Sequence, residues 1–333
     1  MFKDLKGINK EREERDRKHT VDRLQEICEA FLKKPEIKSP WEKDANYEEF
    51  FGKWGNLPMT DRYYTLLQLG LDKIIFDEKD LRSFIYANAN KDLNGDDSRN
   101  LGVFSGLLLH LLTERNKEKN KRTVFCIDGQ GNQFDRLLQY TPNADILVVQ
   151  NFKGEGICDA VGTAGKAKIL IARNIEGDFT LNDAGMLSGE IGLIIAKDLA
   201  GEFILNDISG HEGKTDLVIA DNIKGDDVFY YAAKEKGRIN TAYTRGIAPY
   251  EFSLRQAKDN GIQKFICANK QPHVYAKETI TKQENPAQYQ RLVREHKINE
   301  MLYLVDSLEG KDEQEMAKIA LKIDRVYETT KNV

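Results

Sequence analysis

The chain has few of the residues that cross-link small domains or bind metal ions. Its four cysteines are widely spaced and include no CxxC pair. Because disulfide-rich domains and zinc ribbons need closer cysteines, we expect reduced thiols, as in cytosolic proteins. The five histidines are scattered and share no metal-ligand spacing. The sequence therefore predicts no structural metal site and no cofactor.

A long hydrophobic run is also missing. The longest apolar stretch, residues 101–112, is 12 residues long and is interrupted by glycine, serine and histidine. A helix that spans a membrane needs about 20 apolar residues. The first residues are charged rather than apolar, so we also expect no signal peptide. The sequence thus predicts a cytoplasmic protein without a membrane partner, in which residues 101–112 form a buried helix.

Neither sign of charge dominates the chain. Fifty basic and 54 acidic residues give a net charge of −4. Domains that bind nucleic acid carry a basic excess or a basic stripe. We therefore expect no nucleic-acid partner.

The N-terminal part of the chain has helical periodicity. Apolar residues spaced by three or four predict helices over residues 8–34, 61–71, 78–88 and 98–118. Ser98 is the expected N-cap of the last of these. The first helix is highly charged, and we interpret its beginning as a solvated arm.

The C-terminal part returns to helical periodicity. Asn285-Pro286 is a typical helix start, and Gly310 separates two expected helices. The predicted organisation is a helical region with a charged arm (1–97), a capping helix (98–122), a repeat region (123–270) and a helical hairpin (285–333).

The middle of the chain repeats with a period of 24 residues. Two columns of glycine and one of Asn or Asp recur in phase. The first glycine column is Gly154, Gly177, Gly201 and Gly225, and the second is Gly165, Gly189, Gly213 and Gly237. The column of Asn151, Asn174, Asp198 and Asn222 precedes the first glycine column by three residues. Self-similarity at a fixed period indicates a repeat architecture.

Apolar residues within each repeat alternate as in a β-strand. We predict two strand-like segments per repeat, separated by turns in which glycine supplies positive φ. Such segments bury their side chains only when stacked, at ~4.8 Å per rung. Ile169, Leu193 and Leu217 are expected to stack in this way, pointing inward. The fold class is therefore α+β: a central right-handed parallel β-helix, or β-solenoid, of about seven rungs, interrupted by a helical excursion at 251–260 and capped by α-helices at both ends.

A leucine-rich-repeat solenoid is the alternative architecture. Ile169-x-Ile171-x-x-Asn174 fits the start of that repeat. Its consensus then requires leucine two positions after the asparagine, where this chain has Glu176. The β-helix is therefore favoured.

A resemblance to known proteins rests on two turns, Gly177-Asp-Phe179 and Gly201-Glu-Phe203, each of which is followed by another glycine. Residues 154–237 resemble the glycine-punctuated β-helix found at the C-terminus of the large glutamate synthase chain and in formylmethanofuran dehydrogenase. Those domains pack against other domains, so the resemblance implies a scaffold rather than a catalyst.

Asp159, Asp183 and Asp207 recur at 24-residue spacing, with Asn182 and Asn206 beside the last two. In a solenoid they form a polar ladder with carboxylates ~5 Å apart. Like charges at that distance repel unless they are solvated or bridged, which makes the ladder a candidate Ca²⁺ or Mg²⁺ site. A solvated corner supported by amide ladders is the simpler interpretation.

Two functions follow from these observations. The first is a non-catalytic scaffold or interaction protein, with a protein partner or self-association, because regular repeats offer a long face. The alternative is an enzyme that acts on carbohydrate or another polymer in a groove on the solenoid, using the three aspartates with Tyr230 and Tyr231. No catalytic residue is assigned, and whether the protein is an enzyme stays open.

Overall fold

The structure is a computed structural model that describes residues 2–33, 69–247, 261–268 and 276–331. The helix predicted over 61–71 lies almost wholly outside these ranges, as does the excursion expected at 251–260. Among the described residues, no helix is both long enough and apolar enough to cross a membrane.

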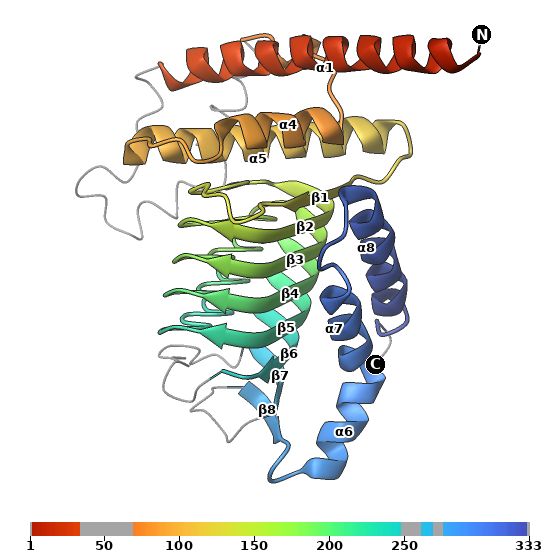
Figure 1. The fold of residues 1–333 in the computed structure, drawn as a ribbon. Helices are drawn as coiled ribbons and strands as arrows, with labels where there is room; N and C mark the ends of the chain where they lie inside the picture. The colour runs from red at the N-terminus through yellow and green to blue at the C-terminus, as the bar shows by residue number, and fades with distance from the viewer. Residues whose placement is uncertain (1, 34–68, 248–260, 269–275, 332–333) are drawn as a thin grey trace.

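A single parallel sheet forms the centre of the molecule, with its eight strands in chain order (Figure 1). The strands are β1 (Val124–Asp128), β2 (Asn143–Lys153), β3 (Lys166–Glu176), β4 (Glu190–Ala200), β5 (Lys214–Lys224), β6 (Arg238–Arg245), β7 (Ile262–Cys267) and β8 (Ala276–Thr281). Neighbouring strands pair in the predicted phase, since Ile169 lies beside Leu193 and Leu193 beside Leu217. The β-solenoid is confirmed, with about five turns rather than about seven, and its sheet continues to residue 281 rather than ending at 270.

Each turn of the solenoid holds one strand, so the prediction of two strands per repeat is wrong. After each long strand, every second residue adopts a left-handed backbone, as Phe179, Leu181 and Asp183 do at φ of 57°, 58° and 53°. Such residues cannot continue an extended strand. Their N–H groups bond alternately to the next and the preceding turn: Phe179 N to Glu202 O at 2.9 Å, and Leu181 N to Ile157 O at 3.0 Å. These bonds offset a cost of ~1–2 kcal/mol for each left-handed residue. We call this side of the solenoid the turn face.

The strands bury apolar side chains on both sides of the sheet. Residues such as Leu170, Ile194 and Val218 point into the solenoid, where they share a core with Leu181 and Leu205 of the turn face. Their neighbours along each strand point outward and pack against the C-terminal helices. This outward column includes Ile169, Leu193 and Leu217. The predicted stacking of these three residues is correct, but their predicted inward direction is wrong.

Helices cover the beginning of the solenoid, as expected. They are α1 (Phe2–Leu32), α4 (Glu78–Asn88) and α5 (Gly95–Glu118), with a 3₁₀ turn at Leu71–Lys73. Helix α5 lies directly on the first turn, where Ser105 Oγ accepts a 2.9 Å hydrogen bond from the backbone N–H of Leu138. Its N-cap is Asn94 rather than Ser98, because the Asn94 side chain accepts from the N–H groups of Asp96 and Asp97.

The C-terminal segment forms three helices, α6 (Pro286–Glu295), α7 (Ile298–Asp306) and α8 (Glu313–Glu328). The single helix expected before Gly310 is broken at Lys297, whose φ is 48°. In Figure 1 the three helices run along the outer face of the sheet, rather than across the open end of the solenoid. They lie there because the outward column of the strands is apolar and shares a core with them.

The four cysteines are buried thiols without disulfide partners, as predicted. Burial raises the pKa of Cys28 and of Cys126 to about 12. These two thiols therefore stay protonated at neutral pH, which argues against a nucleophilic role.

Candidate functional site

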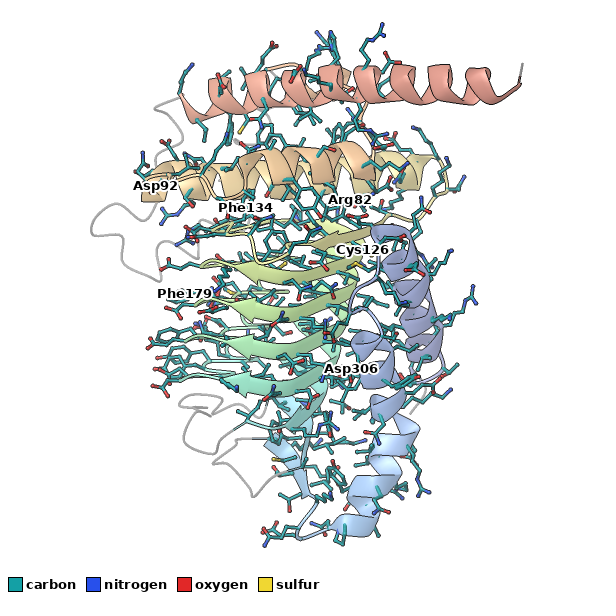
Figure 2. All side chains as sticks on the ribbon, in the orientation of Figure 1. Arg82, Asp92, Cys126, Phe134, Phe179 and Asp306 are labelled. Carbon is teal, nitrogen blue, oxygen red and sulfur yellow. The ribbon has the colours of Figure 1, made fainter. Side chains whose placement is uncertain are left out.

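A groove on the turn face brings together the polar ladder and several aromatic side chains. Its volume is about 620 Å³, within the range of small-molecule sites. All five residues suspected in the sequence line it: Asp159, Asp183, Asp207, Tyr230 and Tyr231. Figure 2 shows Phe179, another lining residue, on the side of the solenoid opposite the C-terminal helices. We call this cavity the turn-face groove.

The first carboxylate of the ladder is held by amides. Asp159 is buried, and its Oδ2 accepts a 2.6 Å hydrogen bond from Gln139 Nε2, while its Oδ1 accepts one of 3.0 Å from Asn182 Nδ2. Asn206 Nδ2 in turn donates to Asn182 Oδ1 at 2.6 Å. The predicted amide ladder therefore exists and is directed toward Asp159. Arg136 Nη1 lies 3.9 Å from Asp159 Oδ2 and supplies positive charge.

The third carboxylate is paired with a lysine. Asp207 is buried, and Lys234 Nζ lies 2.6 Å from its Oδ2. The central carboxylate, Asp183, forms no ion pair with any residue that the structure describes. The two outer aspartates thus have a neighbouring cation, and the middle one lies between two carboxylates.

This arrangement separates the proton affinities of the three groups. Burial, followed by the charges of Asp159 and Asp207, raises the pKa of Asp183 well above its ordinary value. Burial also raises the pKa of Asp207, to about 6, and the charge of Lys234 opposes this rise. For Asp159, burial raises the pKa and the bonds from Asn182 and Gln139 oppose the rise. Because interacting carboxyls titrate as a set, Asp183 is the member that holds a proton most strongly.

Aromatic rings form a second column beside the ladder. Phe179 and Phe203 stack with ring centroids 5.1 Å apart and planes 5° from parallel. Phe203 contacts Tyr230 edge-on, with ring centroids 6.2 Å apart, and the ring centroids of Tyr230 and Tyr231 are 3.9 Å apart. Lys234 Nζ sits 4.8 Å from the centre of the Tyr231 ring, which joins the aromatic column to the ladder. Aromatic rings and carboxyl groups thus follow the same axis of the groove.

The three aspartates do not form a metal centre. Within the ranges that the structure describes, no group of three or more His, Cys, Asp or Glu side chains could hold a metal ion. The carboxylates instead lie one turn apart along the solenoid, and two of them already have cationic partners. The amide ladder of the simpler interpretation is present, but Asp159 and Asp207 are buried rather than solvated.

Several residues of the groove escaped the sequence analysis. Phe179 and Phe203 share the repeat spacing of the aspartates, so their phase could have placed them beside the ladder. Arg99 reaches the groove from α5, and Lys234 comes from the turn after the last aspartate. Neither belongs to a repeat column, so no pattern in the sequence points to them.

Fold and site together define the protein as a parallel β-solenoid with a carboxyl-rich, aromatic-lined groove on its turn face. No family model, curated protein or solved structure matches the chain. The resemblance of residues 154–237 to the β-helices of glutamate synthase and formylmethanofuran dehydrogenase therefore stays a prediction.

Proposed function

We propose that the protein binds a carbohydrate in the turn-face groove. The observation that carries this proposal is the parallel course of the aromatic column and the carboxylate ladder within one cavity. A sugar ring has apolar C–H faces, which pack on aromatic rings, and a hydroxyl edge, which bonds to carboxylates and amides. Phe179, the exposed end of the aromatic column, supplies the first kind of surface, and Asp183 with Asn206 supplies the second.

An elongated ligand fits this arrangement better than a compact one. The groove is lined from Arg99 on α5, over the first turn, to Glu235 before β6. Successive turns are ~4.8 Å apart, which is close to the length of one sugar unit in an extended chain. An oligosaccharide lying along the solenoid axis would therefore meet similar groups at each turn.

Glycoside hydrolysis is the second candidate function, and the raised pKa of Asp183 favours it. A glycosidase needs one protonated carboxyl as general acid and one ionised carboxylate close to it. Asp183 would be the acid, and Asp207, whose charge Lys234 stabilises, would be the nucleophile or base. In retaining enzymes these two groups are ~5–5.5 Å apart, which is comparable to the spacing of ~4.8 Å between successive turns of a solenoid.

The scaffold function depends on a different surface. The long flat face of the sheet is covered by α6–α8, so the chain's own helices occupy the surface on which a partner would dock. Helix α1 remains as a docking element; among its described side chains, residues 15–32, those buried in the core it shares with α4 and α5 are Leu24, Cys28 and Phe31. A protein partner or self-association therefore stays a prediction.

Calorimetric titration with neutral, acidic and amino-sugar oligosaccharides tests the binding proposal. Phe179→Ala should weaken binding of the best ligand about ten-fold, the loss expected for about 1.4 kcal/mol of ring stacking. Phe179 is 37% exposed, so its truncation leaves no core cavity. The matched control is Tyr303→Ala on α7, whose side chain is 73% exposed and lies outside the groove. Absence of binding to all three classes, or equal affinity of the Phe179 variant and wild type, would refute the proposal.

Hydrolysis is tested separately with Asp183→Asn. The amide keeps the shape of the side chain but cannot donate the proton to a leaving group. We expect binding to persist while hydrolysis falls by about 10²–10⁴-fold. Wild-type protein that binds an oligosaccharide without cleaving it would limit the function to binding.

A further inference from the structure

A second cavity lies on the opposite side of the sheet, near the end of the solenoid. Its volume is about 680 Å³. Strands β5–β8 form one wall, and the C-terminal ends of α6 and α8 contribute His296 and Lys331. The two cavities share no lining residue, so whatever this one binds is independent of the turn-face groove.

The cavity exists because the outward apolar column ends here. The column that contains Leu193 and Leu217 continues as Thr241, Lys264 and Glu278 in the next three strands. Polar side chains offer the helices no apolar surface to pack against. The sheet and the helices therefore enclose a polar space beside the shared core, which itself continues through Tyr243, Ile266 and Ile280.

Three cations line this space without an acidic partner among the described residues. They are Arg238 on β6, Lys264 on β7 and Lys277 on β8, none of which forms an ion pair within the described ranges. A fourth cation, Lys331, forms an ion pair with Glu328, in which Lys331 Nζ lies 3.1 Å from Glu328 Oε1. The first three thus leave the cavity with positive charge that is not neutralised by direct pairing.

The two carboxylates that line the cavity are engaged by uncharged donors. Asp216 accepts hydrogen bonds from Tyr327 Oη at 3.0 Å and from Asn240 Nδ2 at 2.9 Å. Glu278 lies beside Lys264 in the neighbouring strand, but its Oε1 accepts from Gln288 Nε2 at 2.8 Å. Both acids are therefore held in place without using the cations.

One lining residue also has an unused polar atom. His296 is 6% exposed, and its Nε2 is buried without a hydrogen-bond partner among the described residues. Burial, together with the nearby Lys264, lowers the pKa of His296, so the ring is neutral at pH 7. A buried polar atom without a partner is costly, and a ligand that bonds to it would remove the cost.

We propose that this cavity binds a small molecule bearing a phosphate group. A phosphate has three terminal oxygens and can accept from donors on three strands, whereas a carboxylate has two. The cavity is larger than one phosphate requires, so the remaining volume would hold the organic part of the ligand. The site is distinct from the groove and does not depend on the proposed carbohydrate function.

Inorganic pyrophosphate and phosphate are the probes that test this proposal, by calorimetric titration of the full chain at low salt. We expect binding to wild type and at least about ten-fold weaker binding to the Lys264→Gln, Lys277→Gln double variant, because charge-assisted hydrogen bonds to phosphate are lost. The control is Lys318→Gln, Lys322→Gln on α8, which changes the net charge equally at two exposed positions outside the cavity. The control should bind as wild type does.

A second measurement locates the probe. The ring ¹⁵N signals of His296 should shift on addition of pyrophosphate and should not shift in the double variant. No binding to wild type at millimolar pyrophosphate would overturn the proposal. Equal losses in the double variant and the control would also overturn it, as would binding that leaves the His296 signals unchanged.

Discussion

Glycine at position 213 should set the spacing between turns of the solenoid. Gly213 has no left-handed φ, so alanine could adopt its backbone conformation. The obstacle is space: an added Cβ would lie 3.0 Å from Gly210 O and from Ser209 Cα, and closer still to Gly185 O of the preceding turn. These are backbone atoms, and the turn is fixed by bonds such as Arg238 N to Gly213 O at 2.8 Å. Relief therefore requires movement of a whole turn.

The size of this effect can be worked out from the contacts. Overpacking a rigid core costs typically ~1–3 kcal/mol, and a clash with backbone belongs at the upper end. Alanine also stabilises by about 0.5 kcal/mol through the unfolded state. We therefore expect Gly213→Ala to lower the free energy of unfolding by about 2 kcal/mol or more. This explanation differs from the sequence-based one, which assigned positive φ to both glycine columns.

Guanidinium unfolding followed by far-ultraviolet circular dichroism measures the change. The matched control is Gly95→Ala, since Gly95 begins α5 with no atom within 4 Å of an added Cβ. Its midpoint should stay the same or rise slightly, because alanine favours helix. A free energy of unfolding for Gly213→Ala within about 0.5 kcal/mol of the wild-type value would show that the turns can accommodate the added methyl group. A similar fall in both variants would also refute the reasoning.

Three further predictions concern charge and covered surfaces. Because the pKa of Asp183 is raised in the folded state, its ionisation lowers the stability of the fold as pH rises above about 4. Asp183→Asn should therefore raise the urea midpoint of unfolding at pH 8 but not at pH 3. Equal gains at both pH values would contradict this. Burial raises the pKa of Asp221, but hydrogen bonds from Arg245 and Lys197 outweigh it, and the net shift is downward. Asp221→Ala should accordingly lower the free energy of unfolding by about 3–5 kcal/mol at pH 7, and by less as pH falls below about 4, as measured by thermal unfolding. An effect independent of pH would exclude the ion pairs as its cause. Deletion of residues 285–333 should uncover the outward apolar column and give an oligomeric or insoluble product by light scattering, whereas a soluble monomer would show that the helices are dispensable.

The candidate site could be predicted in part. The spacing of Asp159, Asp183 and Asp207 placed them in one ladder, and the same phase placed Tyr230 and Tyr231 next to it. The sequence could not show that Asp183 is the member that forms no ion pair with a described residue. That difference depends on Arg136 and Lys234, neither of which belongs to a repeat column. Proton affinity is set by such neighbours and by burial, and neither is visible in a repeat pattern.

The sequence by itself determined the parallel stacking of the chain. Its 24-residue period aligns equivalent residues, so Ile169, Leu193 and Leu217 had to lie above one another whatever the details of the turn. Only the tertiary structure decided which way these residues point. A strand with apolar residues on both sides has no preferred inner face, and the direction is fixed by what covers each side. Here the turn face covers one side, and α6–α8 cover the other because their apolar faces bury the outward residues of the strands in a shared core.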